Sequence, residues 1–347
     1  MEQSIALSRS IKPKLFDQEL SPLCKDNEIE EICSDIRRLL DQAVHRSLTS
    51  NKIGILLSGG LDTSIIATIS SKYTRLRTYT VALEGAPAPD VEYSSLIARK
   101  LGFDHKVHYL DEAEVNELIT PVVKALGTFD PMEIRNSLTI FASMRVAKED
   151  GIEIILTGDG SDELMAGYSF FFNLKKGELD LELQKLWGSM SFSAIPLAKS
   201  LGLVAKIPFL DPDFKSYAMS LDSKYKIWVK DGEVYGKWIL HKAYEGILPQ
   251  EITWRTKTPI EYGSGTTTLS QLFASRISDE AFNEKKGYYM EKDKVTLRDK
   301  EHLAYYEIFR SVIGTPHRAR HGKACPQCNS DVPERSTFCR ICGAYPI

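Results

Sequence analysis

Residues 53–64 read IGILLSGGLDTS, a short apolar run followed by two glycines, an aspartate and several hydroxyl side chains. The run from Ile53 to Leu57 has the length and composition of a buried strand, and a helix is expected to begin near Ser64. Consecutive glycines let backbone N–H groups turn toward an anion without obstruction by Cβ atoms, and the amino end of a helix adds partial positive charge. The stretch therefore predicts a strand, a phosphate-binding loop and a helix in succession.

The chain around this loop alternates between strand-like and helix-like segments. Further strands are expected at residues 77–83, 105–110 and 152–156, and helices at 27–48, 91–101, 112–126 and 137–149. Strands separated by helices favour a mostly parallel sheet with right-handed crossovers, so we predict an α/β fold. After residue 170 the strand signal weakens, and the chain to residue 314 is expected to be mainly helical.

A second glycine-rich loop follows the strand that is expected to end at Leu156. Residues 157–163 read TGDGSDE and place Asp159, Asp162 and Glu163 close together. Neighbouring carboxylates repel one another unless they bind cations or hydrogen-bond donors, and Mg²⁺ prefers oxygen ligands of this kind. A solvated acidic turn is the other interpretation of the same residues. Ligands of parallel sheets bind beyond the carboxyl ends of the strands, where both loops are expected to lie.

The two loops together resemble the asparagine synthetase family. Residues 58–64 are similar to the PP-loop of ATP pyrophosphatases, which cleave ATP between the α and β phosphates, and GDGSDELMAGY at 158–168 resembles a second motif of asparagine and β-lactam synthetases. Neither the GxxxxGK[ST] pattern of a Walker A loop nor the GxGxxG pattern occurs here. The resemblance covers roughly residues 39–265. It implies a PP-loop domain at 51–314, preceded by an arm and an amphipathic helix at 1–50.

The resemblance also implies a set of site residues. The ATP site would be built from Ser58, Gly59, Gly60, Leu61, Asp62, Thr63, Ser64, Val81, Thr157 and Gly158. Catalytic roles would fall to Lys237, Asp159, Asp162 and Arg135. Asp62 and Asp162 would share Mg²⁺, and Lys237 would stabilise charge on the phosphates. Asp159, or after it Glu163, would accept a proton from the attacking amine, and Arg135 would lie close to the acceptor substrate.

The reaction that this resemblance implies is the ATP-dependent amidation of a small carboxylate, aspartate first, with AMP and pyrophosphate as products. Only 57 residues precede the first loop, and residue 2 is Glu2 where glutamine-dependent relatives carry a catalytic cysteine. We therefore expect the nitrogen to come from free ammonia or from a separate glutaminase. Two alternatives stay open: a PP-loop enzyme acting on a macromolecule such as tRNA or a carrier protein, and a nucleotide-binding protein without catalysis.

Several positions depart from the family pattern near the expected acceptor site. Residues 204–206 read VAK where the family carries an ExR triplet, and Met132 and Glu133 stand where threonines are frequent. His241 replaces the arginine of a KxxLR element that begins at Lys237. These changes leave the ATP-binding residues intact and concentrate on the side of the acceptor.

The C-terminal segment carries two CxxC pairs made of Cys325, Cys328, Cys339 and Cys342. This spacing predicts a tetrahedral structural zinc site that resembles rubredoxin-like ribbons, and the metal should supply most of the folding energy of so small a unit. Two disulfides are the other interpretation. We place the ribbon at residues 323–347 and a basic linker at 315–322. A macromolecule is considered as a docking partner of the ribbon. Cys24 and Cys33 are expected to be ordinary buried thiols.

Composition and charge exclude several classes of protein. The chain has 347 residues, of which 43% are hydrophobic, and a formal net charge of −3, so no overall attraction to nucleic acid or membrane is expected. No apolar run approaches the ~20 residues that span a bilayer, and the first residues lack the pattern of a signal peptide. These features predict a cytoplasmic location without a membrane partner.

Overall fold

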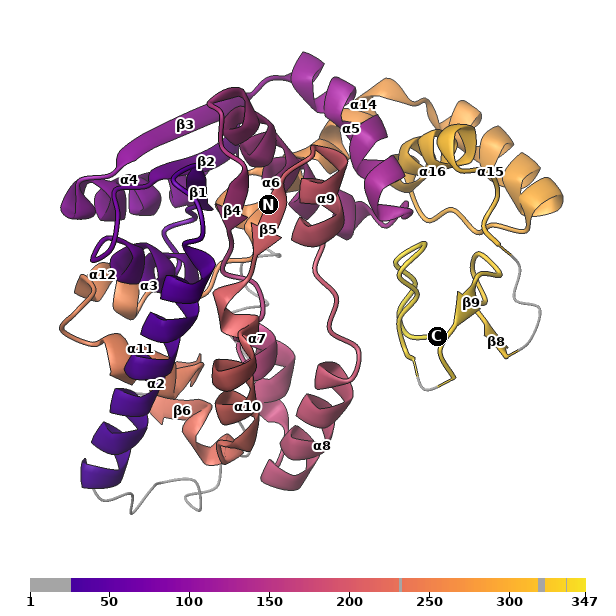
Figure 1. Ribbon diagram of the computed structural model, residues 1–347. Coiled ribbons are helices and arrows are strands. Elements are labelled where there is room, and N and C mark those ends of the chain that lie inside the picture. The colour runs from indigo at the N-terminus through magenta and orange to yellow at the C-terminus, as the bar shows by residue number, and fades with distance from the viewer. Residues whose placement is uncertain (1–25, 231–232, 318–321, 335) are drawn as a thin grey trace.

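A five-stranded parallel sheet forms the centre of the protein (Figure 1). The structure is a computed structural model and describes residues 26–230, 233–317, 322–334 and 336–347. In spatial order the strands are β3 (Asp104–Leu110), β2 (Arg77–Leu83), β1 (Ile53–Leu56), β4 (Ile154–Leu156) and β5 (Val204–Lys206). The predicted α/β fold with a parallel sheet is confirmed, and β5 is a strand that the sequence analysis missed. Three residues are too few for a hydrophobic period to be visible.

The order of the strands creates a topological switch point beside β1. β1 pairs with β2 on one side, with Ile55 opposite Thr78, and with β4 on the other, with Ile55 opposite Leu156. The chain runs from β1 outward to β2 and β3 and then returns to the opposite side of β1 as β4. At such a point the connections leave in opposite directions, and a crevice opens beyond the carboxyl ends of the two strands.

Helices cover both faces of the sheet. The helices up to β5 are α2 (Asp26–Ser47), α3 (Leu61–Ser70), α4 (Pro89–Leu101), α5 (Glu112–Leu126), α6 (Pro131–Glu149), α7 (Ser161–Leu164), α8 (Lys176–Trp187) and α9 (Ala194–Ser200). Those after β5 are α10 (Pro212–Ser220), α11 (Trp238–Tyr244), α12 (Gln250–Thr253), α13 (Ile260–Gly263), α14 (Leu269–Arg276), α15 (Asp279–Asp293) and α16 (Lys300–Val312). A hairpin of β6 (Ile227–Lys230) and β7 (Glu233–Gly236) interrupts the second set, and the region to residue 314 is otherwise mainly helical, as predicted.

Two apolar cores lie on opposite faces of the sheet, because side chains alternate along each strand. Ile155 of β4 belongs to the core beneath α5, α6 and α9, whereas its neighbour Leu156 belongs to the core beneath α2, α3 and α11. In Figure 1, α2 is the long indigo helix that lies alongside α11, on the side of the sheet away from α16. The predicted amphipathic helix is thus confirmed, and it packs on the α/β domain.

The start of α6 differs from the prediction. The helix begins at Pro131 rather than at residue 137, and the side chain of Asp130 accepts a hydrogen bond from the N–H of Met132. An aspartate cap followed by proline at the first helical position is a strong start signal, because proline lacks only an N–H that would have no helical partner there. The earlier start brings Glu133 and Arg135 onto the first turns of a helix.

The cysteine-rich segment forms a small ribbon with a two-stranded hairpin, β8 (Lys323–Ala324) and β9 (Asp331–Val332). It is the yellow unit below α15 and α16 in Figure 1. Cys33 is buried in α2 as predicted, whereas Cys24, the N-terminal arm and residues 318–321 of the basic linker lie outside the described residues. Within the described part of the chain, no helix is long and apolar enough to cross a membrane.

Candidate functional site

The two glycine-rich loops meet at the switch point. A Cβ atom built on Gly158 would lie 3.0 Å from both Asp62 Cβ and Thr63 Cγ2, so the second loop packs directly against the first. The hydroxyl of Ser161 also donates a hydrogen bond of 2.7 Å to Asp62 Oδ1. Residues about one hundred positions apart in the chain therefore form one surface beyond the carboxyl ends of β1 and β4.

The first loop has the features of an anion site. Gly59 has a positive φ of 68°, and a Cβ atom there would overlap the backbone N of Ser94, so no larger residue fits. The hydroxyls of Ser58 and Thr63 lie 3.1 Å apart. No side chain caps the amino end of α3, which leaves its first N–H groups for a ligand. Ser64 is buried, and its hydroxyl has no hydrogen-bond partner among the described residues.

A buried lysine joins the two loops. Nζ of Lys237 lies 2.8 Å from Asp62 Oδ2 and 2.9 Å from Asp162 Oδ1, and only 5% of the residue is exposed. Nζ of Lys257 contacts the same oxygen of Asp162 at 2.7 Å. Burial on its own would raise the pKa of Asp162, but the two ammonium groups outweigh it and hold that pKa at about 2. Asp162 is therefore ionised at every physiological pH.

The backbone at Lys237 has a strained conformation that is held by neighbouring residues. Burial on its own would lower the pKa of Lys237, but the carboxylates of Asp162 and Asp62 raise it above its usual value. The residue has a left-handed φ of 54°, which costs a non-glycine residue about 1–2 kcal/mol. Its N–H donates a hydrogen bond of 3.0 Å to the carbonyl of Met165, and Gly236 packs against the carbonyl of Ala166. Contacts with the end of the second motif thus hold the strained residue in place.

Carboxyl groups with raised pKa values gather beside the second loop. Burial raises the pKa of Asp159 to about 6, and the neighbouring charges of Glu163 and Asp162 add to the effect. Burial also raises the pKa of Glu163, which accepts a hydrogen bond of 2.5 Å from the Tyr168 hydroxyl. Glu133 on α6 has a pKa that burial raises as well, and its charge acts on Asp159. These three carboxyl groups form the acidic side of the crevice. The lysine-rich side is formed by Lys237 and Lys257 around Asp162.

Arg135 takes part in a network of ion pairs rather than standing free. Its Nε lies 2.6 Å from Glu261 Oε2 on α13, and its Nη1 lies 2.7 Å from Glu301 Oε2 on α16. The guanidinium of Arg135 thus already donates hydrogen bonds to two carboxylates. The predicted role of Arg135 beside the acceptor substrate stays a prediction, and its visible role is to tie α6 to the two later helices.

Three further residues of the site received no role from sequence. Lys257 lies in an RTK segment at residues 255–257, and Ser161 appeared only as part of the second motif. Arg255 of the same segment lies 2.7 Å from Asp90 Oδ1, donates to the Ser58 carbonyl at 3.3 Å and supports the first loop from behind. Asp90, the ion-pair partner of Arg255, lies 165 positions away in the chain, so no local sequence pattern indicates the contact.

Three other predicted site residues, Val81, Thr157 and Leu61, are buried in the domain. Val81 is buried on β2, two residues beyond Tyr79, whose carbonyl pairs with the end of β1, so it lies next to the first loop. Thr157 is buried and donates a hydrogen bond of 2.9 Å to Asp159 Oδ2. Leu61 is a buried core residue at the start of α3. The structure therefore brings Val81, Thr157 and Gly158 to the same end of the sheet as the first loop.

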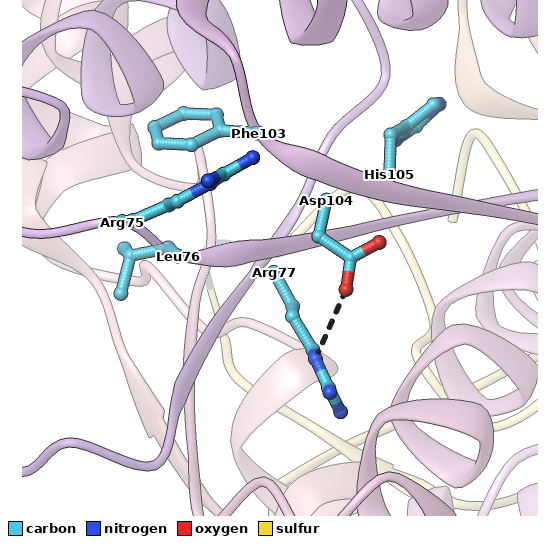
Figure 2. A pocket seen from close by; sticks show the side chains of 6 residues that line it. All are labelled: Arg75, Leu76, Arg77, Phe103, Asp104 and His105. Atoms are coloured by element: carbon cyan, nitrogen blue, oxygen red, sulfur yellow. Dashed lines mark ion pairs between the residues drawn. The ribbon is translucent and has the colours of Figure 1, made fainter.

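An open hollow of about 520 Å³ lies elsewhere in the molecule (Figure 2). Its lining includes Arg75, Arg77 and Asp104, and the last two form an ion pair of 3.2 Å. These residues stand at the amino ends of β2 and β3. Since all five strands are parallel, this hollow opens at the edge of the sheet opposite the two loops and is unconnected with them.

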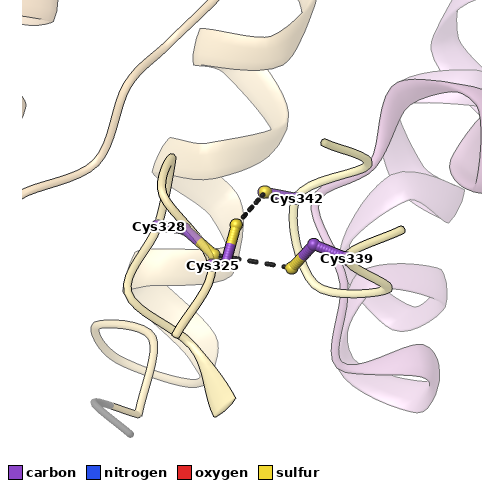
Figure 3. A group of neighbouring side chains, drawn as sticks. All are labelled: Cys325, Cys328, Cys339 and Cys342. Atoms are coloured by element: carbon purple, nitrogen blue, oxygen red, sulfur yellow. Dashed lines mark hydrogen bonds between the residues drawn. The ribbon is translucent and has the colours of Figure 1, made fainter. Parts of the chain in front are cut away.

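The four cysteines of the ribbon form a compact cluster (Figure 3). Their Sγ atoms lie within 4.8 Å of one another, and all four residues are buried. The Sγ atoms of Cys325 and Cys342 lie 3.6 Å apart and those of Cys328 and Cys339 3.7 Å apart, so the thiols are free. Four sulfur ligands around one point can hold a metal ion with tetrahedral preference.

Comparisons with known proteins identify the family of the chain. The Asparagine synthase family model matches residues 35–194 and 196–324. The asparagine synthetase of Sandersonia aurantiaca is 29% identical over 81% of this chain and 58% of its own length, and asparagine synthetase B of Escherichia coli is 30% identical over 85% of this chain and 56% of its own length. The chain thus spans somewhat more than half the length of these curated relatives.

Likeness to solved structures is weak. An NH3-dependent NAD synthetase of Campylobacter jejuni has a TM-score of 0.34 at 11% identity, covering 76% of this chain and 94% of that protein. A U34-tRNA thiolase of Methanococcus maripaludis has a TM-score of 0.32 at 13% identity, covering 87% of this chain and 85% of that protein. The family match extends over both glycine-rich loops and over Lys237 and Lys257, so this chain belongs to the asparagine synthase family.

Proposed function

We propose that the protein is a C–N ligase that activates a small carboxylate with ATP, releases pyrophosphate and transfers the acyl group from AMP to ammonia. Ammonia is supplied free or by a separate glutaminase. The observation that carries this proposal is the cluster of Asp62, Asp162 and Lys237 at the switch point, where both loops meet. The family match and the relatives support it.

The lysine-rich side of the crevice suits the phosphates of ATP. The hydroxyls of Ser58 and Thr63 and the uncapped amino end of α3 offer donors to the leaving pyrophosphate. The ammonium groups of Lys237 and Lys257 lie at the edge of the same loop pair and attract phosphate oxygens as point charges. Such charges stabilise the transition state in which negative charge spreads over those oxygens.

Asp62 and Asp162 fit the proposed magnesium site. A single ammonium group touches both carboxylates, so they face a common point of the size of a cation, and both are oxygen ligands. Bound Mg²⁺ would neutralise phosphate charge there. The two loops pack directly on each other at Gly158, so the residues of the chain itself would orient the nucleotide.

The acidic side of the crevice suits the attacking nitrogen. Asp159 lies on the second loop with a raised pKa, which makes its carboxylate a better proton acceptor for the attacking amine. Aspartate is the first acceptor to test because the relatives are named asparagine synthetases. Because Arg135 is held by Glu261 and Glu301, acids without a second carboxylate belong in the same panel of substrates.

The first expected result concerns the products. Incubation with ATP, Mg²⁺, ammonium and the correct acid should give AMP and pyrophosphate in equal amounts with the amide, because the first loop resembles a pyrophosphate-binding loop and lacks a Walker lysine. Mass spectrometry of the mixture over a panel of amino acids identifies the acceptor at the same time. ADP and phosphate as stoichiometric products would contradict the proposed reaction.

The second expected result is a pH dependence that is confined to amide formation. Asp159 must be ionised to accept a proton, and its pKa is raised to about 6. The rate, expressed per concentration of unprotonated ammonia, should therefore fall about tenfold per pH unit below that value and level off above it. Exchange of labelled pyrophosphate into ATP requires no such proton transfer, so its rate should not show this fall at low pH. Asp159→Asn should remove amide formation and keep the exchange. Amide formation in that variant with the same fall in rate at low pH would exclude Asp159 as the proton acceptor.

We further propose that the four cysteines hold zinc in a structural role. Four buried sulfur ligands form a closed set with no position left for a substrate, which is typical of structural zinc. The ribbon has a hairpin of only two residues per strand, so a metal would supply much of the energy that keeps it folded.

A further inference from the structure

The ribbon is attached to the turn that leads into α6. The backbone N–H of Phe129 donates a hydrogen bond of 2.8 Å to the carbonyl of Ile341, and the hydroxyl of Thr128 donates one of 2.8 Å to the carbonyl of Arg340. Gly343 packs so closely on the carboxylate of Asp130 that a Cβ atom would overlap it. The second cysteine pair thus forms its loop directly against residues 128–130.

A second set of contacts holds the ribbon from the segment that precedes α16. Arg298 donates a hydrogen bond of 2.9 Å to the carbonyl of Cys342 and one of 3.1 Å to the side chain of Gln327. The backbone N–H of Thr296 donates one of 2.7 Å to the carbonyl of Gln327. One arginine therefore contacts the loops of both cysteine pairs.

The cysteines and the turn share one apolar core. All four cysteines belong to the same buried cluster as Phe129 and the apolar side of α16. The ring of Phe129 packs on Tyr306 and Phe309 of α16, with centroid distances of 5.0 Å in both cases. The ribbon is therefore packed as part of the domain, in contrast to a tethered module on a linker.

These contacts reach the acidic side of the crevice through α6. Asp130 caps this helix, and the next residues along it are Glu133, whose charge acts on Asp159, and Arg135, which ties α6 to Glu261 and Glu301. Displacement of the 128–130 turn would move the first turn of α6 and these side chains with it. The ATP side is supported by other groups, among them Arg255 behind the first loop.

We propose that the four-cysteine ribbon, with its metal bound, is a positioning element of the acceptor half of the active site. It fixes residues 128–130 and thereby the first turn of α6, on which binding of the acceptor depends, whereas binding of Mg²⁺–ATP does not depend on it. The proposal rests on the proposed function for its kinetic part. Its structural part concerns only the coupling between the ribbon and α6.

The test uses Thr128→Val in the full chain, because it removes one hydroxyl at the interface and leaves all four cysteines. Thr128→Ser keeps the hydroxyl and serves as the conservative variant. Thr139→Val is the matched control: Thr139 is a buried threonine on α6 whose hydroxyl bonds only to the carbonyl of Asn136 in its own helix. Zinc content, hydrogen–deuterium exchange, Mg²⁺–ATP affinity and the KM for the acceptor are measured on each.

Thr128→Val should keep about one zinc per chain and its affinity for Mg²⁺–ATP. Exchange of amides 128–136 and the KM for the acceptor should each rise roughly five- to tenfold, with little change in kcat, because the variant loses a hydroxyl that donates to the carbonyls of Arg340 and Ile341 and accepts from the N–H of Asp130. Thr128→Ser should restore both values, and Thr139→Val should leave them unchanged. Removal of the zinc with a chelator should enlarge the same exchange change in amides 128–136.

Two outcomes would overturn the proposal. If chelation accelerates exchange only in residues 323–347, the ribbon is an appended unit, as a docking module for a macromolecule would be. If Thr128→Val or chelation weakens Mg²⁺–ATP binding as strongly as acceptor binding, the ribbon supports the whole domain instead of one half. A chain that shows no amide formation with any acid contradicts the proposed function, and the exchange and ATP-binding measurements still decide the coupling.

Discussion

Asp162→Asn is expected to abolish ATP-dependent pyrophosphate release while leaving the fold intact. The carboxylate has a pKa of about 2, because Lys237 and Lys257 outweigh the effect of burial, so it is ionised at neutral pH. The neutral amide removes a proposed ligand of Mg²⁺ and half of the negative charge that faces Lys237. Loss of such a charge should cost several kcal/mol of transition-state stabilisation, which corresponds to a rate reduced by about 10³-fold or more. Asp62→Asn should behave in the same way.

The measurement is exchange of labelled pyrophosphate into ATP, with circular dichroism as the check on folding. Asp159→Asn is the matched control, since it changes a carboxyl group three positions away on the same loop and should retain the exchange. Near-normal exchange in either Asp162→Asn or Asp62→Asn would remove both residues from the proposed ATP site. A loss of exchange in all three variants would mean that the loop fails as a unit.

Lys237→Met is expected to lose activity and also to destabilise the protein. The variant leaves the carboxylates of Asp62 and Asp162 facing each other without the ammonium that now lies between them at 2.8 Å and 2.9 Å. Breaking a buried ion pair by removing one partner costs about 3–5 kcal/mol. Asp162 would keep its ion pair with Lys257, whereas Asp62 would have no ammonium partner left among the described residues. Urea unfolding at neutral pH measures this change in the free energy of unfolding.

The destabilisation should depend on pH in a defined direction. The pKa of Asp162 in the folded protein lies below its ordinary value of 3.8, so its interaction with the lysines stabilises the protein above that pH and is lost as pH falls toward about 2. The difference between Lys237→Met and wild type should therefore narrow as pH decreases below about 4. A difference that stays constant or widens there would exclude the ion pair as its cause.

An exposed lysine provides the control for this experiment. Lys176 on α8 forms an ion pair of 2.8 Å with Asp222, and half of its side chain is exposed. Lys176→Met should change the free energy of unfolding by less than about 1 kcal/mol, because solvent screens such pairs. A comparable loss in both variants would show that the effect comes from methionine itself and not from the buried cluster.

Local sequence sufficed for the features that depend on neighbouring residues. The first loop was predictable because an apolar strand, two glycines and a helix start follow one another within residues 53–64. The second loop and the cysteine pairs were predictable for the same reason, since spacing along the chain sets which atoms can reach one anion or one metal. The short strand β5 and the hairpin of β6 and β7 escaped, because so few residues show no clear period.

The tertiary structure decided which charges meet. Lys237 reaches Asp62 across 175 positions of the chain, and Arg135 reaches Glu301 across 166, and no local pattern encodes either pairing. Likewise, the sequence indicated that four cysteines could bind a metal but not that Thr128 and Arg298 would hold the ribbon against α6. The physical reason is that chain-local rules determine backbone conformation and ligand spacing, whereas the burial and the partners of a charge depend on packing between distant segments.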